Sequence, residues 1–82
     1  MNRRELEERI IRIVAGVART DTGTITPDTN LITDLGVDSA SALVLLVELE
    51  DAFDVTLSDR AAANLRTVGD IVRYLDGIVR PQ

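Results

Sequence analysis

The stretch "DLGVDSASALVLLVELEDAF", residues 34–53, decides the fold of this chain. It opens on turn residues and reaches Asp38 and Ser39, either of which can cap a helix by accepting hydrogen bonds from the free N–H groups of the first turn. Apolar residues then recur at helical spacing, which predicts a helix from Ser39 to Phe53. One face of this helix is assigned to the core: Ala42, Leu45, Leu46, Leu49 and Phe53.

The opposite face of the same helix is also apolar. It holds Ala40, Leu43, Val44 and Val47, and acids follow at Glu48, Glu50 and Asp51. A chain of 82 residues buries only part of its surface and cannot enclose one helix on all sides. Acids near a helix C-terminus oppose the helix dipole, at about 0.3–1 kcal/mol each if exposed. Helix stability therefore does not explain them, whereas solubility or a partner protein does.

Three further helices are expected around this one. Residues 3–18 and residues 67–79 carry apolar stripes at helical spacing, and a short helix is expected after Ser58, ending near Asn64. The last stripe consists of Ile71, Val72, Leu75, Ile78 and Val79, and Thr67 with Asp70 resembles a capping box. Residues 20–37 are rich in turn residues, and their apolar members indicate a loop pinned to the core.

These elements predict an all-α fold. We expect a four-helix bundle of three longer helices and one short helix, with a long loop between the first and second helices. Residues 1–82 are expected to form a single domain, because domains of this length hold one modest core.

The composition argues against a self-contained enzyme. The chain has no cysteine, no histidine and no lysine, which removes thiolate chemistry, the commonest general base and Schiff bases. A serine nucleophile needs a base within reach, and exposed carboxylates are weak bases at neutral pH. The acids do not follow the calcium-loop pattern, so no metal site is predicted.

Acidic residues are concentrated in the middle of the chain. The segment from Thr20 to Asp59 holds nine acids and no base, while the residues on either side carry more arginine than acid. Such a segment repels nucleic acid and suits a partner with a basic surface. No apolar run is long enough for a signal peptide or a bilayer span, so we expect a cytoplasmic protein without a membrane partner.

Ser39 stands where a helix N-terminus presents unpaired N–H groups and a partial positive charge. These features favour a bound phosphate, and Gly36 allows the tight backbone path that leads to the helix. Taken alone, a serine at this position is most simply a helix cap.

The ordered pattern D-L-G-V-D-S, then E-L-E-D-A-F, then T-V-G-D-I resembles the acyl carrier protein family over nearly the whole chain. The resemblance implies a discrete, non-catalytic carrier with 4'-phosphopantetheine attached to Ser39 by a separate phosphopantetheinyl transferase. Asp38 would help to present Ser39 to that transferase. Cargo would ride on the thiol of the arm as a thioester, which explains how a chain without cysteine takes part in thiol chemistry.

The resemblance also implies a docking face for partner enzymes. We assign it to Ala40, Leu43, Val44, Val47, Glu48 and Asp51, with Leu43 alternatively turned into the core. The expected partners are acyltransferase, ketosynthase or adenylating and ligase enzymes with basic and apolar docking surfaces. We expect a monomer, because the apolar pattern does not persist over enough heptads for a coiled coil.

Three positions depart from the family pattern. Ala40 stands where the family usually has a large apolar residue, and Ser41 and Val44 stand where fatty-acid carriers tend to have acids. We therefore expect a specialised, polyketide-type biosynthetic pathway. A peptidyl or aminoacyl carrier of a nonribosomal-peptide-type pathway, and a helical adaptor that binds through residues 40–51 without an arm, are the alternatives.

Overall fold

The first helix is closed at both ends by its own backbone and side chains. The computed structural model describes residues 2–79, and α1 spans Arg3–Ala18. Asn2 caps it: the N–H of Glu5 donates to Asn2 Oδ1 at 2.8 Å, and the N–H of Asn2 donates to Glu5 Oε1 at 3.3 Å. At the other end Arg19 adopts a left-handed conformation, and the N–H of Thr20 returns to the carbonyl of Ala15.

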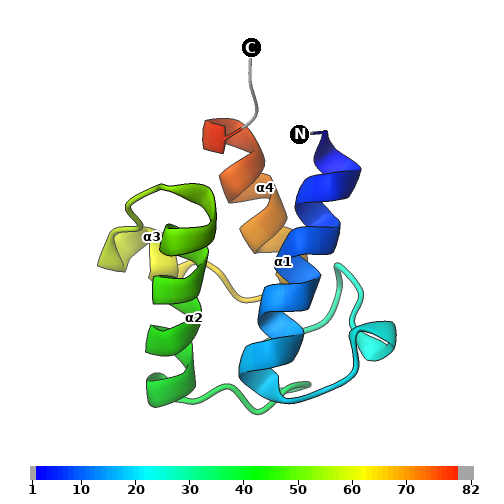
Figure 1. The fold of residues 1–82 in the computed structure, drawn as a ribbon. Coiled ribbons are helices and arrows are strands. Elements are labelled where there is room, and N and C mark those ends of the chain that lie inside the picture. The colour runs from blue at the N-terminus through cyan, green and yellow to red at the C-terminus, as the bar shows by residue number, and fades with distance from the viewer. Residues whose placement is uncertain (1, 80–82) are drawn as a thin grey trace.

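The second helix, α2, spans Ser39–Phe53, with the bounds expected from the sequence. It runs antiparallel to α1, which packs against both α2 and α4 (Figure 1). Leu45, Leu49 and Phe53 on its inner face are buried, whereas Ala42 and Leu46 are half-buried. A guanidinium from α1 holds its end, because Arg9 lies over the Phe53 ring, 4.7 Å from the ring centroid, and donates to the carbonyl of Ala52 at 3.1 Å.

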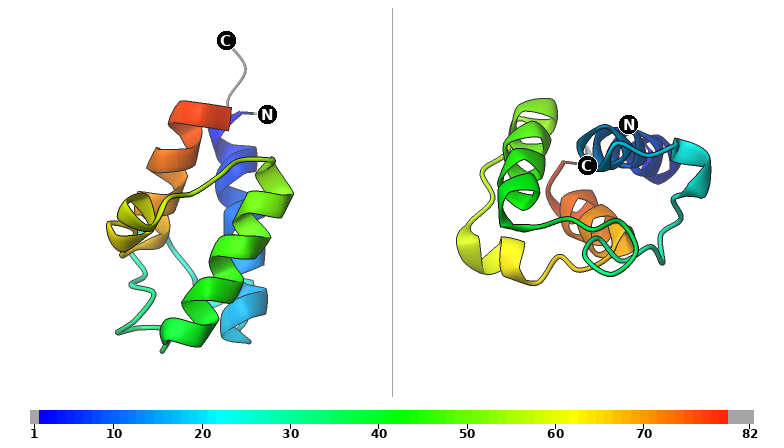
Figure 2. Two further views of the ribbon diagram at one scale, coloured as in Figure 1. Left: turned by 90° about the vertical axis from the view of Figure 1, so that its left-hand side faces the viewer. Right: turned by 90° about the horizontal axis from the view of Figure 1, so that it is seen from below.

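The two remaining helices differ in how they contribute to the core. The short helix α3 spans Asp59–Ala63, is capped by Ser58 and holds no buried residue. Helix α4 spans Val68–Val79 and buries Val68, Ile71, Val72 and Leu75. Figure 2 shows α3 beside α2 and α4, away from α1. Three longer helices therefore enclose the core and α3 covers one side.

The predicted capping box of α4 is confirmed. The N–H of Asp70 donates to Thr67 Oγ1 and the N–H of Thr67 donates to Asp70 Oδ2, each at 3.1 Å. In contrast, Ile78 of the predicted apolar stripe does not lie in the core: it is 52% exposed, and Leu75 is the last buried residue among the α4 side chains that the structure describes. The Val79 side chain and residues 80–82 lie outside the described residues.

The segment between α1 and α2 is pinned to the core, as expected. It contains a short 3-10 helix, η1, at Thr22–Thr24, and it buries Ile25, Leu31 and Val37. Its backbone is also bonded to the start of α4. The N–H of Val68 donates to the carbonyl of Thr29, the N–H of Gly69 donates to that of Pro27, and the N–H of Leu31 donates to that of Arg66. Gly69 permits this approach, since a Cβ there would lie 3.0 Å from the Pro27 carbonyl oxygen.

The predicted all-α fold with its long first loop is confirmed. Between residues 2 and 79 there is no β-strand, and β-type pairing is limited to one isolated antiparallel bridge between Asn30 and Thr67. Within the same residues no helix is both long and apolar enough to cross a membrane. That residues 1–82 form a single domain stays a prediction.

Candidate functional site

Ser39 is the first residue of α2, and α2 begins at the end of the bundle where α1 ends (Figure 1). Its side chain is exposed. Within residues 2–79 the Ser39 hydroxyl takes part in no hydrogen bond. The oxygen is therefore accessible to another molecule at the N-terminus of α2, where N–H groups and the helix dipole favour an anion.

Asp38 caps α2, and this leaves the Ser39 hydroxyl unused. Asp38 Oδ1 accepts hydrogen bonds from the Ser41 N–H at 2.9 Å and from the Ser41 hydroxyl at 2.8 Å. The backbone N–H of Ser41, followed by its hydroxyl, holds the pKa of Asp38 below its usual value. Asp38 thus remains a carboxylate beside Ser39 and fixes the first turn of α2. Of the two caps that the sequence allowed, the structure uses Asp38.

A tight turn delivers the chain to this cap. The N–H of Gly36 donates to the carbonyl of Ile32, and the N–H of Val37 donates to that of Leu31 at 2.9 Å. Gly36 has φ +69°, in the left-handed region that other residues rarely adopt. The expectation that Gly36 allows a tight backbone path toward the helix is confirmed, because Gly36 adopts this left-handed backbone angle.

A groove between α2 and α3 opens beside Ser39. It has a volume of about 660 Å³, within the range of about 300–1,000 Å³ that is typical of small-molecule sites. Apolar side chains from α2, α3, α4 and the first loop form most of its lining, and the polar residues among them are Asn30, Thr33, Asp38, Ser39 and Arg66. Periodicity did not reveal this groove, because it depends on where α3 lies and not on its sequence.

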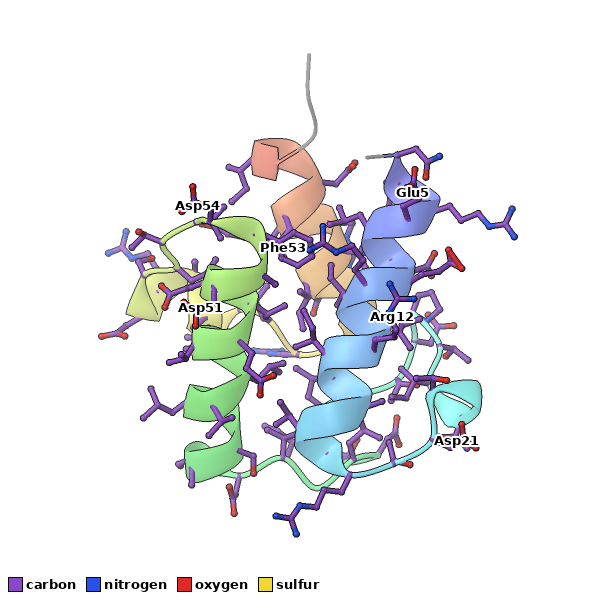
Figure 3. The ribbon with its side chains drawn as sticks, viewed as in Figure 1. Glu5, Arg12, Asp21, Asp51, Phe53 and Asp54 are labelled. Atoms are coloured by element: carbon purple, nitrogen blue, oxygen red, sulfur yellow. The ribbon has the colours of Figure 1, made fainter. Side chains whose placement is uncertain are left out.

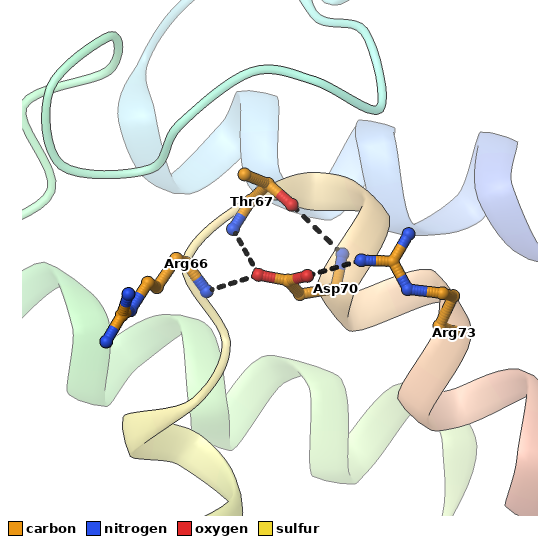
Figure 4. A network of polar contacts seen from close by, with 4 residues as sticks. All are labelled: Arg66, Thr67, Asp70 and Arg73. Atoms are coloured by element: carbon orange, nitrogen blue, oxygen red, sulfur yellow. Dashed lines mark hydrogen bonds and ion pairs between the residues drawn. The ribbon is translucent and has the colours of Figure 1, made fainter.

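Two carboxylates hold the segments on either side of α3. Glu50 Oε2 accepts from the N–H of Leu57 at 2.8 Å, before α3 begins. After α3, Asp70 Oδ2 accepts from the N–H of Arg66 at 3.0 Å and from that of Thr67, while its other oxygen pairs with Arg73 (Figure 4). The hydrogen bond that Glu50 accepts from Leu57 corrects our interpretation that the acids near the C-terminus of α2 serve solubility or a partner protein.

The outer face of α2 is exposed as expected. Leu43 is 63% exposed, Val44 49% and Val47 48%, so the alternative that Leu43 turns into the core is wrong. Ala40, Glu48 and Asp51 are exposed on the same helix. Figure 3 shows Asp51 on α2 facing outward, whereas Phe53 points inward toward α1. An apolar strip with an acidic end therefore lies uncovered next to Ser39.

Comparison with known proteins decides which family this site belongs to. A family model described as phosphopantetheine attachment site matches residues 8–75. An acyl carrier protein of Syntrophobacter fumaroxidans is 41% identical over 70 residues, covering 85% of this chain and 86% of the relative. One of Prochlorococcus marinus is 34% identical over 76 residues, covering 93% of this chain and 95% of the relative. The chain belongs to the acyl carrier protein family.

The fold of this acyl carrier protein agrees with a solved structure. A chain from Mycobacterium tuberculosis, provisionally assigned as an acyl carrier protein, superposes with a TM-score of 0.82 at 42% identity, covering 88% of this chain and 96% of that one. Membership of the family makes the protein a non-catalytic carrier of cargo on a covalently attached 4'-phosphopantetheine. It also implies a phosphopantetheinyl transferase and biosynthetic enzymes as partners.

Proposed function

We propose that Ser39 carries the phosphopantetheine arm and that Asp38 presents it to the transferase. The supporting observation is the exposed and unbonded Ser39 hydroxyl at the start of a helix, inside the region that the family model matches. The residues present fit the group, because the first-turn N–H groups and the dipole of α2 favour a phosphodiester at this place. Attachment forms a bond from Ser39 Oγ to the phosphorus of coenzyme A that bears the pantetheine. The pyrophosphate bond of coenzyme A breaks, adenosine 3',5'-bisphosphate leaves, and the hydroxyl proton passes to the transferase.

Intact mass spectrometry tests this assignment. The protein is incubated with a promiscuous phosphopantetheinyl transferase and coenzyme A, and one added phosphopantetheine is expected. Ser39→Ala should gain none. Ser41→Ala is the matched control: it removes a serine hydroxyl two residues away but keeps the backbone N–H that Asp38 caps. An arm on the Ser39→Ala variant, or none on the wild type, overturns the assignment.

We further propose that partner enzymes dock on the outer face of α2, namely Ala40, Leu43, Val44, Val47, Glu48 and Asp51. Buried apolar area on this face stabilises a complex by about 25 cal/mol per Å². The two acids at its end steer and orient a basic partner surface. Ala40 is small, so the contact falls to the exposed Leu43, Val44 and Val47 further along the helix.

Substitution of Val44 by Asp tests the docking face. Val44 and Ile78 have similar exposure, 49% and 52%, but Ile78 lies on α4. Val44→Asp should slow modification or cargo transfer by partner enzymes at unchanged melting temperature, whereas Ile78→Asp should leave the transfer rates as they are. Equal rates for the two variants would exclude the face.

The cargo of a polyketide-type pathway, an acyl group, remains our proposal for this carrier. The support is the first half of the docking face, where Ala40 replaces the large apolar residue of the family and Val44 replaces an acid of fatty-acid carriers. The test offers the arm-bearing protein to an acyltransferase and to an adenylating enzyme that loads amino acids. Loading by the acyltransferase supports the proposal, and loading by the adenylating enzyme alone indicates a peptidyl carrier instead.

A further inference from the structure

Among the residues that the structure describes, Arg66 is the one basic residue that lines the groove between α2 and α3. The other lining residues are apolar, neutral polar or, at Asp38, acidic, and the segment from Thr20 to Asp59 holds nine acids and no base. Arg66 is an exposed residue that also lines this apolar groove, and charges beside low-dielectric walls interact more strongly than charges in open water.

The backbone of Arg66 is fixed on both sides, which sets the direction of its side chain. Its N–H donates to Asp70 Oδ2 at 3.0 Å, and its carbonyl accepts from the N–H of Leu31 at 2.9 Å. The nearby carboxylate of Asp70 pairs with Arg73, and the Arg66 side chain extends away from it (Figure 4). Asp70 therefore binds the backbone N–H of Arg66 and not the Arg66 guanidinium, and the Arg66 side chain lines the groove.

The guanidinium of Arg66 is not engaged by another residue. Among residues 2–79 it forms no hydrogen bond or ion pair. The one acid that lines the groove is Asp38, whose Oδ1 already accepts from the N–H and the hydroxyl of Ser41. Arginine presents five N–H donors in a planar fork that matches a carboxylate. The groove thus combines apolar walls with a guanidinium that can bind an anion.

We propose that Arg66 is a specificity-determining residue, which favours acyl cargo with a second carboxylate, such as the half-thioester of a dicarboxylic acid. The inference rests on the proposed attachment of the arm to Ser39, which lines the same groove. The methylene part of such cargo lies along the apolar walls and its carboxylate accepts from the guanidinium. The acid-rich middle of the chain would otherwise repel an anionic cargo.

A comparison of two eight-carbon cargoes tests the role of Arg66. Octanoyl and octanedioyl arms are loaded from their coenzyme A thioesters, and intact mass confirms loading. Hydroxylamine then cleaves the thioesters, and each rate is divided by that of the corresponding coenzyme A thioester. We expect the octanedioyl form to be cleaved about two- to fivefold more slowly than the octanoyl form, as for an exposed ion pair.

Substitutions assign this protection to one side chain. Arg66→Gln should abolish the difference between the cargoes, Arg66→Lys should restore part of it, and salt should weaken it. Arg60→Gln is the matched control, since Arg60 is an exposed arginine on α3 that does not line the groove, and it should retain the difference.

Each alternative outcome can be told apart. If the arm does not attach, the intact mass shows this before cleavage, and the proposed function itself fails. Equal protection of both cargoes overturns the assignment of Arg66 to the cargo carboxylate. An equal change of both rates in Arg66→Gln also overturns it, because Arg66 then binds the phosphodiester that the two forms share.

Discussion

Removal of the Glu50 carboxylate should loosen the segment between α2 and α3. In Glu50→Ala the Leu57 N–H loses its acceptor, and a hydrogen bond to a charged group is worth about 1.5–3 kcal/mol. The change also removes an acid from the C-terminal end of α2, which returns about 0.3–1 kcal/mol by relieving the dipole. The free energy of unfolding should therefore fall by about 0.5–2.5 kcal/mol. Each kcal/mol lowers the melting temperature by about 4–8 °C.

Glu48→Ala is the matched control for Glu50→Ala. Glu48 lies two residues away on the same helix and is exposed, so its removal relieves the dipole without losing a bond. Urea unfolding followed by circular dichroism measures both variants. Glu48→Ala should unfold at the wild-type midpoint or slightly above it, and Glu50→Ala below it. If the two midpoints coincide, the carboxylate of Glu50 does not anchor the segment before α3.

Two further predictions concern α4 and the core. The N–H groups of Thr67 and Arg66, together with Arg73, hold the pKa of Asp70 below its usual value. The Asp70 carboxylate therefore stabilises the folded protein fully above the unfolded pKa of about 3.9, and this contribution is lost as the pH falls through the folded pKa. Asp70→Asn should therefore lower the free energy of unfolding at pH 7 by about 0.5–1 kcal/mol, which is measured as a lower melting temperature. The difference in melting temperature between variant and wild type should vanish below about pH 4. A difference that does not depend on pH would contradict this. Leu49→Ala should lower the free energy of unfolding in urea by about 2–5 kcal/mol, because Leu49 is 1% exposed. Val47→Ala should change it by no more than about 0.5 kcal/mol. Similar losses for both variants would refute the assigned faces of α2.

The helices could be predicted because each carries local signals of its own. The bounds of α2 followed from the capping residue Asp38 and the apolar spacing that ends at Phe53, and the cap of α4 followed from Thr67 and Asp70. These signals act over three or four residues, so one sequence displays them. Ile78 fits the same periodicity and is nevertheless exposed. Periodicity shows which face of a helix is apolar, but it does not show how far along the helix the core extends.

The contacts of the candidate site that depend on tertiary structure could not be predicted. The groove beside Ser39 is lined by residues of α2, α3, α4 and the first loop, which only the tertiary structure brings together, and Arg66 lines it because Asp70 and Leu31 fix its backbone. Glu50 reads in the sequence as an acid that opposes the helix dipole, and only its bond to Leu57 reveals an anchor. Such interactions join segments whose separation in the chain carries no periodic signal.

The location of the arm on protein isolated from its native producer tests the central claim most directly. Fragmentation of the intact protein by mass spectrometry should place phosphopantetheine, with or without cargo, on Ser39. The exposed and unbonded Ser39 hydroxyl at the start of α2 predicts this result. Phosphopantetheine on any other hydroxyl, with Ser39 unmodified, would contradict it.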